Sequence, residues 1–252
     1  MKKNFLHVND YSSEKLASIL DKSQWIKNKF KNNENYLPLK GKTMAMIFAK
    51  PSARTRISFE TGFFRLGGHA LYLGPNDIGI GKRESVADIA RVISRFNDII
   101  MARLFKHNHM LELAEFSNVP VVNGLTDFNH PCQIVADLFT ISEHIGRMKD
   151  FSIAYVGDGN NIVHSWFELA MITPIKLNIV CPETFLPDMK LFELAKSKGV
   201  SDITIEHDPH KGVKDCDVVY TDVWASMGQK EEAEERRKKF EGFQVNSDLM
   251  AA

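Results

Sequence analysis

The stretch TMAMIFAKPSARTRISFETGFFRL, residues 43–66, decides the fold of this chain. It begins with the short apolar run Thr43–Phe48, continues through a turn that contains two arginines, and ends in an amphipathic segment, Ala53–Leu66. A short apolar run bounded by turn residues is typical of a buried strand, and apolar residues at helical spacing are typical of a helix. The stretch therefore predicts a strand–turn–helix unit of an α/β protein.

The same alternation of short apolar runs and longer amphipathic segments continues along the chain. In the first half it predicts strands at His69–Leu73, Asp98–Arg103 and Pro120–Asn123, and helices near Glu84–Phe96 and His107–Ser117. In the second half it predicts strands at Phe151–Val156, Leu177–Cys181, Asp202–Glu206 and Val218–Val223, and helices near Ile162–Met171 and Met189–Ser197. Strands that alternate with helices form βαβ units, so we predict an α/β fold with two doubly wound parallel-sheet domains, residues 1–146 and 147–252.

Three further helices are predicted outside these units. Pro131–Ile145 carries apolar residues at helical spacing and stops at Gly146, so it is a candidate bridging helix between the domains. The charged run Gln229–Lys239 has mixed signs at helical spacing, which indicates a solvated helix face. An N-terminal helix shows one apolar stripe, formed by Leu16, Ile19, Leu20, Ile26 and Phe30.

Composition and charge exclude several classes of protein. The 32 lysines and arginines balance the 32 aspartates and glutamates, which argues against general nucleic-acid binding. The three cysteines form no CxxC pair, so neither a disulfide framework nor a zinc site is indicated. The longest apolar runs are strand-sized and the N-terminus lacks the apolar core of a secretory signal, so we expect a cytoplasmic protein that does not bind membranes.

The turn Pro51–Arg56 is the sharpest candidate site, because it links a predicted strand to a predicted helix. Such a turn presents backbone N–H groups and the positive end of the helix dipole to an anion. Ser52 and Thr55 add hydroxyl donors, while Arg54 and Arg56 add guanidinium groups suited to phosphate oxygens. Alternatively, the arginines are ordinary surface residues and the hydroxyls only cap the helix. Two arginines at a helix N-terminus oppose its dipole, however, which favours an anion site.

The second candidate is Asn129–Gln133, NHPCQ, at the start of the predicted bridging helix. Pro131 fixes the first helical turn, so His130 and Gln133 lie at a helix mouth where both could reach a ligand. His130 could polarise a carbonyl group. On the other interpretation His130 is a polar cap and Cys132 fills a small buried space, and a nucleophilic Cys132 would require an adjacent base that the sequence does not show.

Two motifs in the second half are ambiguous when each is taken alone. GDGNN, residues 157–161, follows a predicted strand but lacks the third glycine of a dinucleotide-binding fingerprint, so it indicates only a tight turn. DVWASMG, residues 222–228, indicates the end of a strand and a loop, with Met227 as a packing residue.

Five motifs in order give the chain a resemblance to a known family. They are SARTR followed by SFETG at residues 52–62, MARLF at 101–105, HPCQ at 130–133, GDGNN at 157–161 and DVWASMG at 222–228. With them the whole chain resembles the ornithine carbamoyltransferases of the aspartate/ornithine carbamoyltransferase family. Aspartate carbamoyltransferases share the first three motifs, whereas D-x-x-x-S-M-G is the motif that points to ornithine.

The resemblance implies a domain for carbamoyl phosphate and a domain for L-ornithine, in a homotrimer with sites at subunit boundaries and without cofactor or metal. The implied reaction transfers the carbamoyl group to the δ-amine of L-ornithine and gives L-citrulline and phosphate, in arginine biosynthesis or in the recovery of carbamoyl phosphate. The implied carbamoyl phosphate site consists of Ser52, Ala53, Arg54, Thr55, Arg56, Arg103, His130 and Gln133, of which Arg54, Arg103 and His130 would be catalytic. The implied ornithine site consists of Asn161, Asp222, Ser226 and Met227.

Two departures from the family leave alternatives open. The family normally continues past Gly242–Val245 into a strand with an HCLP motif and a helix that packs on the first domain, whereas this sequence ends at Ala252, so we expect a second domain truncated at its C-terminus. The usual glutamine of the loop that reaches a neighbouring subunit falls at Gly79. The alternatives are a carbamoyltransferase for another amine, such as putrescine or an acylated ornithine, and a non-catalytic remnant that only binds carbamoyl phosphate.

Overall fold

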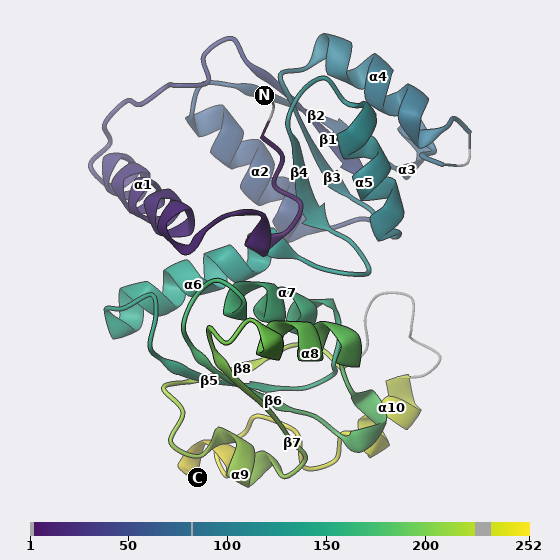
Figure 1. Ribbon diagram of the computed structural model, residues 1–252. Helices are drawn as coiled ribbons and strands as arrows, with labels where there is room; N and C mark the ends of the chain where they lie inside the picture. The colour runs from purple at the N-terminus through teal and green to yellow at the C-terminus, as the bar shows by residue number, and fades with distance from the viewer. Residues whose placement is uncertain (1–2, 82, 225–232) are drawn as a thin grey trace. The chain divides into compact units, whose positions relative to one another are not determined.

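The computed structural model of the protein describes residues 3–81, 83–224 and 233–252. The chain divides into two compact units, Met1–Val135 (unit 1) and Ala136–Ala252 (unit 2), and each unit is built around a four-stranded sheet (Figure 1). All strand pairs in both sheets are parallel. Parallel neighbours require crossover connections, which are helical here, and this confirms the α/β fold with two doubly wound sheets.

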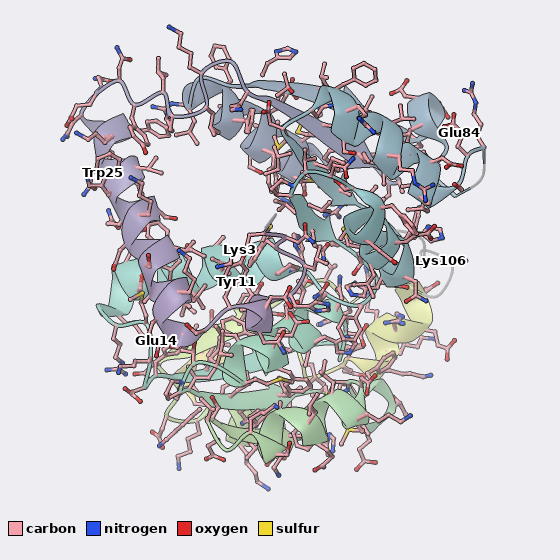
Figure 2. All side chains as sticks on the ribbon, turned by 45° about the horizontal axis from the view of Figure 1, so that its top comes forward. Lys3, Tyr11, Glu14, Trp25, Glu84 and Lys106 are labelled. Carbon is pink, nitrogen blue, oxygen red and sulfur yellow. The ribbon has the colours of Figure 1, made fainter. Side chains whose placement is uncertain are left out.

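Unit 1 contains the strands β1 (Thr43–Phe48), β2 (His69–Leu73), β3 (Ile99–Arg103) and β4 (Val121–Leu125), in the spatial order β2-β1-β3-β4. The N-terminal segment extends this sheet beyond β4, because Phe5 forms a parallel bridge with Val122. Within the same segment the Lys3 ammonium lies 5.3 Å from the centre of the Tyr11 ring, and both side chains are labelled in Figure 2. The N-terminal segment is therefore held at the edge of the sheet through Phe5.

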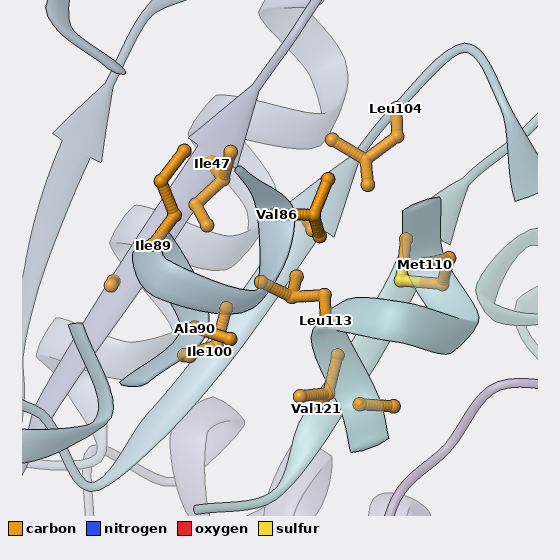
Figure 3. Close-up of a cluster of buried hydrophobic side chains, with 12 residues drawn as sticks. Ile47, Val86, Ile89, Ala90, Ile100, Leu104, Met110, Leu113 and Val121 are labelled. Atoms are coloured by element: carbon orange, nitrogen blue, oxygen red, sulfur yellow. The ribbon is translucent and has the colours of Figure 1, made fainter. Parts of the chain in front are cut away.

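The two faces of this sheet carry different helices, because successive side chains of a strand point to opposite faces. Ala45 and Ile47 of β1 pack with α4 and α5 in the buried cluster of Figure 3, whereas Met44 and Met46 pack with Phe63 of α2. Burial on both faces explains why these strands form nearly continuous apolar runs. The helices of unit 1 are α1 (Ser13–Lys31), α2 (Ala53–Arg65), α3 (Pro75–Ile78), α4 (Val86–Phe96) and α5 (His107–Phe116).

Unit 2 contains the strands β5 (Ser152–Val156), β6 (Lys176–Val180), β7 (Asp202–Glu206) and β8 (Val218–Thr221), in the order β7-β6-β5-β8. Its helices are α7 (Asn161–Ala170), α8 (Met189–Ser197), α9 (Pro209–Val213) and α10 (Ala233–Lys239). Val156 packs with Val213 of α9 and Phe240, while Phe167 of α7 contacts Phe192 of α8 on the other face (Figure 1). The second sheet is therefore also covered on both faces.

The helix α6 (Pro131–Ile145) has the bounds that the sequence predicts. The division between the units falls inside it, at Val135, rather than at residue 146. Its first turn belongs to unit 1, where Cys132 Sγ donates to the carbonyl of Asn123, and its later turns belong to unit 2, where Asp137 accepts from the Tyr220 hydroxyl. The boundary at residue 146 stays a prediction.

Most predicted elements are confirmed, with ends that move by one or two residues. β8 ends at Thr221, before the predicted Val223, because its pairing with β5 ends where Val156 lies opposite Thr221. The short helices α3 and α9 are absent from the prediction, since each is little more than one turn started by a proline. Part of the predicted helix 229–239 lies outside the described residues. Within the described ranges, no helix combines the length and the apolar character that a membrane crossing requires.

Candidate functional site

In each sheet there is one point where the order of the strands reverses direction. In unit 1 the chain goes from β1 to β2 on one side and then crosses to β3 on the other side. Such a reversal leaves a crevice at the carboxyl ends of the two strands, which is where open α/β sheets bind ligands. Phe48 at the end of β1 lies opposite Arg103 at the end of β3. The predicted anion turn and Arg103 therefore meet at this crevice.

The turn between β1 and α2 is organised by Ser52, which is the N-cap of α2. Its backbone is extended, with φ −158° and ψ 110°, and its Oγ accepts a hydrogen bond from the N–H of Thr55 at 3.4 Å. The Ser52 hydroxyl also lies 3.0 Å from Thr55 Oγ1, to which it donates. The first N–H groups of a helix, here beginning at Ala53, have no acceptor within the helix and lie at the positive end of its dipole. The local geometry is that of an anion-binding helix mouth.

The N-terminus of α2 is surrounded by three cationic side chains, Lys50, Arg54 and Arg103. We use the name cationic crevice for these side chains together with the turn. Arg103 Nη1 donates to Thr55 Oγ1 at 3.3 Å, and Arg103 Nε is buried without a hydrogen-bond partner in the part of the chain that the structure describes. Burial and the nearby Arg54 lower the pKa of Arg103, and burial and Arg103 lower the pKa of Lys50. Half-buried cations that destabilise one another are stabilised when an anion binds among them.

His130 reaches the same cations from the loop between β4 and α6. Burial, Arg103 and Lys50 lower the pKa of His130 to about 3, so the ring is neutral at physiological pH. A neutral imidazole has one N–H donor and one acceptor nitrogen. Gln133 lies on the first turn of α6, where its N–H donates to the carbonyl of His130 at 3.1 Å. The structure therefore brings His130 and these cations together, and their shared role in binding stays a prediction.

Cys132, between these two residues, does not act as a nucleophile. Burial raises the pKa of its thiol to about 12, and its Sγ donates to the carbonyl of Asn123 at 3.3 Å. A thiol in such surroundings stays protonated and unreactive. This agrees with the interpretation of Cys132 as a small packing residue.

Two other residues of unit 1 make contacts that explain their positions without an anion. Arg56 Nε forms an ion pair with Glu60 at 3.0 Å, and its guanidinium lies 4.1 Å from the centre of the Tyr72 ring. Its predicted contact with phosphate stays a prediction. Gly79 ends α3 with a left-handed φ of 53°, which favours glycine, and a Cβ there would come 3.1 Å from Arg83 Cβ. The backbone of the loop itself accounts for glycine at this position.

Unit 2 has its reversal between β5 and β8, with the GDGNN turn after β5. The ends of the two strands are joined by the Thr221 hydroxyl, which donates to the carbonyl of Val156 at 2.8 Å. Asn160 caps α7 by accepting from the N–H of Ile162 at 2.9 Å. A Cβ on Gly159 would lie 2.3 Å from the backbone nitrogen of Pro187, so only glycine fits where these two loops cross.

The charges at this second crevice are negative. Asp158 forms an ion pair with Arg236 at 2.8 Å, and its side chain is 18% exposed. Burial raises the pKa of Asp158 and Asp222 raises it further, although the hydrogen bond from Arg236 lowers it. Burial and then Asp222 also raise the pKa of the Tyr155 hydroxyl. We use the name acidic crevice for Asp158 and Asp222 together with the GDGNN turn. Its excess of carboxylate groups suits a ligand with an ammonium group.

The structure describes half of the predicted ornithine site. Asn161 is the first residue of α7, where its carbonyl accepts from the Ser165 hydroxyl at 2.8 Å, and Asp222 directly follows β8. Both belong to the acidic crevice. Ser226 and Met227 lie outside the described residues.

An apolar cavity of about 760 Å³ lies elsewhere in unit 1, and it is lined mainly by side chains from the sheet and α2 such as Met44, Phe59 and Phe63. Cys132 is the residue of the HPCQ motif that contributes to its wall, whereas Lys50, Arg54 and Arg103 do not. In the described ranges, no three His, Cys, Asp or Glu side chains come together as ligands for a metal ion.

Reasoning from the sequence alone missed several residues that shape these crevices. Lys50 and Asp158 each come within two residues of the end of a central strand, and this position is a signal that could have identified both. His7 and His107 contact each other across 100 residues of chain, at 3.2 Å between their Nε2 atoms. No local pattern indicates such a pair.

Both units match models of known protein families. Residues 3–143 match the model described as aspartate/ornithine carbamoyltransferase, carbamoyl-P binding domain. Residues 149–252 match the model described as aspartate/ornithine carbamoyltransferase, Asp/Orn binding domain. The end of α6 lies between the two matches.

Individual relatives cover nearly the whole chain. The chloroplastic ornithine carbamoyltransferase of Pisum sativum is 57% identical over 251 residues, which are 99% of this chain and 67% of that protein. The anabolic ornithine carbamoyltransferase of Pyrococcus furiosus is 48% identical over 98% of this chain and 80% of that protein.

Solved structures agree with both the sequence relatives and the fold. An ornithine carbamoyltransferase structure from Pyrococcus furiosus superposes with a TM-score of 0.93 at 46% identity, over 99% of this chain and 80% of that one. The anabolic ornithine carbamoyltransferase of Campylobacter jejuni gives a TM-score of 0.91 at 36% identity, over 100% of this chain and 82% of that one.

Proposed function

The chain belongs to the aspartate/ornithine carbamoyltransferase family, and on this premise we propose that it transfers the carbamoyl group of carbamoyl phosphate to the δ-amine of L-ornithine. The products are L-citrulline and phosphate. The observation that carries this proposal is the opposite charge of the two crevices, since one substrate is a phosphate compound and the other an α-amino acid with a free ammonium group. No metal or cofactor is required for this transfer.

Carbamoyl phosphate binds in the cationic crevice of unit 1. Its phosphate oxygens accept hydrogen bonds from the N–H groups at the start of α2, from the Ser52 and Thr55 hydroxyls and from Arg54. Arg103, whose Nε is buried and unsatisfied among the described residues, donates to the phosphate and to the carbonyl oxygen of the carbamoyl group. An anion at this position also relieves the repulsion among the three cations.

His130 and Gln133 contact the carbamoyl group itself. The neutral imidazole of His130 donates an N–H to the carbonyl oxygen, and the Gln133 side chain accepts from the carbamoyl NH₂ group. Arg56, if it contacts the phosphate, must exchange its ion pair with Glu60 for that contact.

L-Ornithine binds in the acidic crevice of unit 2. The Asp222 carboxylate accepts hydrogen bonds from the α-ammonium group, and Asn161 at the start of α7 donates to the α-carboxylate. Ser226 and Met227, outside the described residues, complete the contacts to the amino-acid end. The δ-amine then remains available for reaction.

The chemical step is an acyl transfer through a tetrahedral intermediate. The neutral δ-amine attacks the carbonyl carbon of carbamoyl phosphate, and the carbonyl oxygen becomes an oxyanion. The C–O bond to phosphate then breaks, phosphate leaves with the electron pair, and the leaving phosphate takes up the proton that the amine loses. His130 and Arg103 donate hydrogen bonds to the developing oxyanion, and a donor of this kind typically contributes about 10²-fold in rate.

The enzyme is further proposed to act as a cytoplasmic homotrimer. Unit 1 exposes large apolar side chains on one helix, with Ile57 63% and Phe64 73% exposed on α2, and such side chains are typical of a subunit interface. Light scattering on the purified chain tests the trimer directly.

The test of the function is citrulline formation by the purified 252-residue chain with carbamoyl phosphate and L-ornithine. The variant Arg54→Ala removes one cation of the crevice, and we expect its turnover to fall by about 10²-fold. Arg95→Ala on the exposed surface of α4 is the matched control, for which we expect the turnover of the parent chain.

Parallel assays with putrescine and N-acetylornithine compare the amine substrates. Preference for either over L-ornithine would contradict the proposed role of Asp222. A folded chain that binds carbamoyl phosphate in calorimetry without forming any carbamoylated amine would instead support the non-catalytic alternative.

A further inference from the structure

The N-terminal segment reaches the loop that carries His130. The N–H of Phe5 donates to the carbonyl of Val121 at 2.8 Å, and the N–H of Asn123 donates to the carbonyl of Phe5 at 2.9 Å. Two residues further along the chain, His7 lies against the loop Thr126–His130, between β4 and α6. The edge of the sheet therefore positions the segment where it reaches the loop.

A chain of side-chain hydrogen bonds links His7 to this loop at both ends. Asn129 Nδ2 lies 3.0 Å from His7 Nδ1, and His7 Nε2 lies 3.2 Å from His107 Nε2. His107 Nδ1 lies 2.9 Å from the Oγ1 of Thr126. Phe128 packs on both rings, with centroid distances of 5.9 Å to His7 and 5.0 Å to His107.

One arrangement of protons on two neutral rings satisfies these contacts. The amide of Asn129 is oriented by Leu6 and Asn123, because Nδ2 donates to the Leu6 carbonyl at 3.1 Å and Oδ1 accepts from Asn123 Nδ2 at 2.6 Å. His7 Nδ1 must therefore accept from Asn129, and its Nε2–H must donate to His107 Nε2. His107 in turn carries its proton on Nδ1 and donates to Thr126. Both histidines are neutral in this arrangement.

The hydrogen bonds end next to His130. The Thr126 N–H donates to the carbonyl of Asn129 at 2.9 Å, and the Asn129 N–H donates to Thr126 Oγ1 at 3.3 Å. These two bonds close the turn that precedes His130. Since Thr126 and Asn129 each also contact one of the histidines, the pair is joined to the turn on both sides.

We propose that His7 and His107 form a pair of positioning residues, which hold the Thr126–Asn129 turn and thereby fix His130 beside the cationic crevice. The consequence for catalysis rests on the proposed carbamoyl transfer, whereas the effect on the turn does not. Because either ring must lose a hydrogen bond when it gains a second proton, the pair also makes the position of His130 sensitive to acid.

The charged groups around the pair come from three elements. The Asp10 carboxylate accepts from the His7 N–H at 3.1 Å, the Asp127 carboxylate accepts from the His107 N–H at 2.8 Å, and Lys106 is the N-cap of α5. The two carboxylates favour protonated rings, whereas Lys106 and the donor groups of Asn129 and His7 favour neutral ones. The pair is therefore intact while both rings are neutral and opens when either ring gains a second proton.

Three variants separate positioning from general structure. His107→Phe keeps a ring but makes no hydrogen bond to His7 or Thr126. The double variant His7→Gln/His107→Gln retains a donor group and an acceptor at each position but has no ring that can gain a second proton. His69→Gln, at an exposed position on β2, is the control for loss of a histidine.

The first measurement is amide hydrogen exchange at Thr126 and Asn129 without any substrate, at pH 7.5 and 5.5, corrected for intrinsic exchange rates. We expect protection of both amides to fall about 10-fold at pH 5.5 in the parent chain and in His69→Gln, and to be unchanged by pH in the double glutamine variant. His107→Phe should exchange rapidly at both pH values. Equal protection at the two pH values in the parent chain, or full protection in His107→Phe, would overturn the proposal.

The second measurement is steady-state turnover over the same pH range. In His107→Phe we expect kcat to fall about 10-fold with little change in the KM for carbamoyl phosphate, because the phosphate contacts lie on α2 and β3. The double glutamine variant should have the kcat that the parent chain has at pH 7.5. Its kcat should not fall between pH 7.5 and 5.5. If the parent chain shows no turnover, the proposed function fails, while the exchange rates still decide the role of the histidine pair.

Discussion

Unit 1 and unit 2 both place a turn and a helix N-terminus at the carboxyl ends of two neighbouring parallel strands, but opposite charges gather there. In unit 1 burial and Arg103 lower the pKa of Lys50, and His130 is kept neutral beside them. In unit 2 burial and Asp222 raise the pKa of Asp158, whose carboxylate forms an ion pair with Arg236. The backbone determines where each site lies, whereas a few side chains determine the sign of its charge.

The helix dipole acts differently in the two crevices. In unit 1 the positive end of α2 adds to the field of three cations, so the empty site is electrostatically unfavourable and an anion gains from both sources. In unit 2 the positive end of α7 follows the Asp158 turn, where it stabilises carboxylate. Ligand binding is therefore expected to change the stability of unit 1 more than that of unit 2.

The largest expected effect follows from removal of the buried cation in unit 1. In Arg103→Met we expect the affinity for carbamoyl phosphate to fall by about 100-fold or more, because both the charge and the buried donor are lost. The unliganded variant should unfold at the same temperature as the parent chain or a higher one, because the repulsion with Lys50 and Arg54 is relieved. Calorimetry with carbamoyl phosphate and thermal unfolding without it measure the two effects. Arg103→Met with lower stability and full affinity would contradict the assignment of the cationic crevice.

The second effect concerns the turns rather than the charges. The turn of unit 1 accommodates side chains at Ser52 and Ala53, whereas the loops of unit 2 cross at Gly159, where a Cβ would lie 2.3 Å from the backbone of Pro187. Gly159→Ala should therefore lower the free energy of unfolding by about 1–3 kcal/mol, since backbone must move. Gly62→Ala in α2, with nothing within 4 Å of the added Cβ, should raise it by about 0.5–1 kcal/mol. Urea denaturation of both variants makes the comparison, and a neutral Gly159→Ala would show that the loops can separate.

The strand and helix pattern could be predicted because it depends on local periodicity. The helix α6 has the predicted bounds because Pro131 and Gly146 mark its ends within the sequence itself. The bridge from Phe5 to Val122 could not be predicted, because it joins segments that are far apart in the chain and lacks an apolar run of its own.

The candidate sites divide in the same way. The capping of α2 by Ser52 follows from residues three positions apart, and the sequence indicates it directly. The ion pair of Arg56 with Glu60 also has helical spacing, but the contact with Tyr72 depends on the position of β2 beside β1. The partnership of His7 and His107 depends wholly on the folded sheet, so no inspection of either motif could have found it.

The third expected effect separates the two acids of unit 2. Asp222→Asn should raise the KM for L-ornithine about 10-fold, through loss of a charged hydrogen bond to the α-ammonium group, and leave carbamoyl phosphate binding unchanged. Asp158→Asn should instead lower the stability of unit 2, because Arg236, whose side chain is 14% exposed, loses its carboxylate partner. Steady-state kinetics and thermal unfolding of both variants distinguish these roles, and an unchanged KM in Asp222→Asn would remove it from the ornithine site.

The smallest expected effect is a difference in the response of the units to acid. The folded chain holds the pKa of His130 at about 3, whereas an unfolded histidine has a pKa of about 6.5, so only the unfolded chain takes up this proton as the pH falls from 6.5 towards 3. This costs unit 1 stability below pH 6.5, by about 1 kcal/mol between pH 7.5 and 5.5. When the pH is lowered from 7.5 to 5.5, the free energy of unfolding should fall by about 1 kcal/mol less in His130→Gln than in the parent chain. Urea denaturation at the two pH values measures this difference. The raised pKa of Asp158 acts in the opposite direction, since the folded chain binds that proton first and gains stability as the pH falls. An equal acid response in His130→Gln and the parent chain would mean that the cations of unit 1 do not hold this histidine neutral.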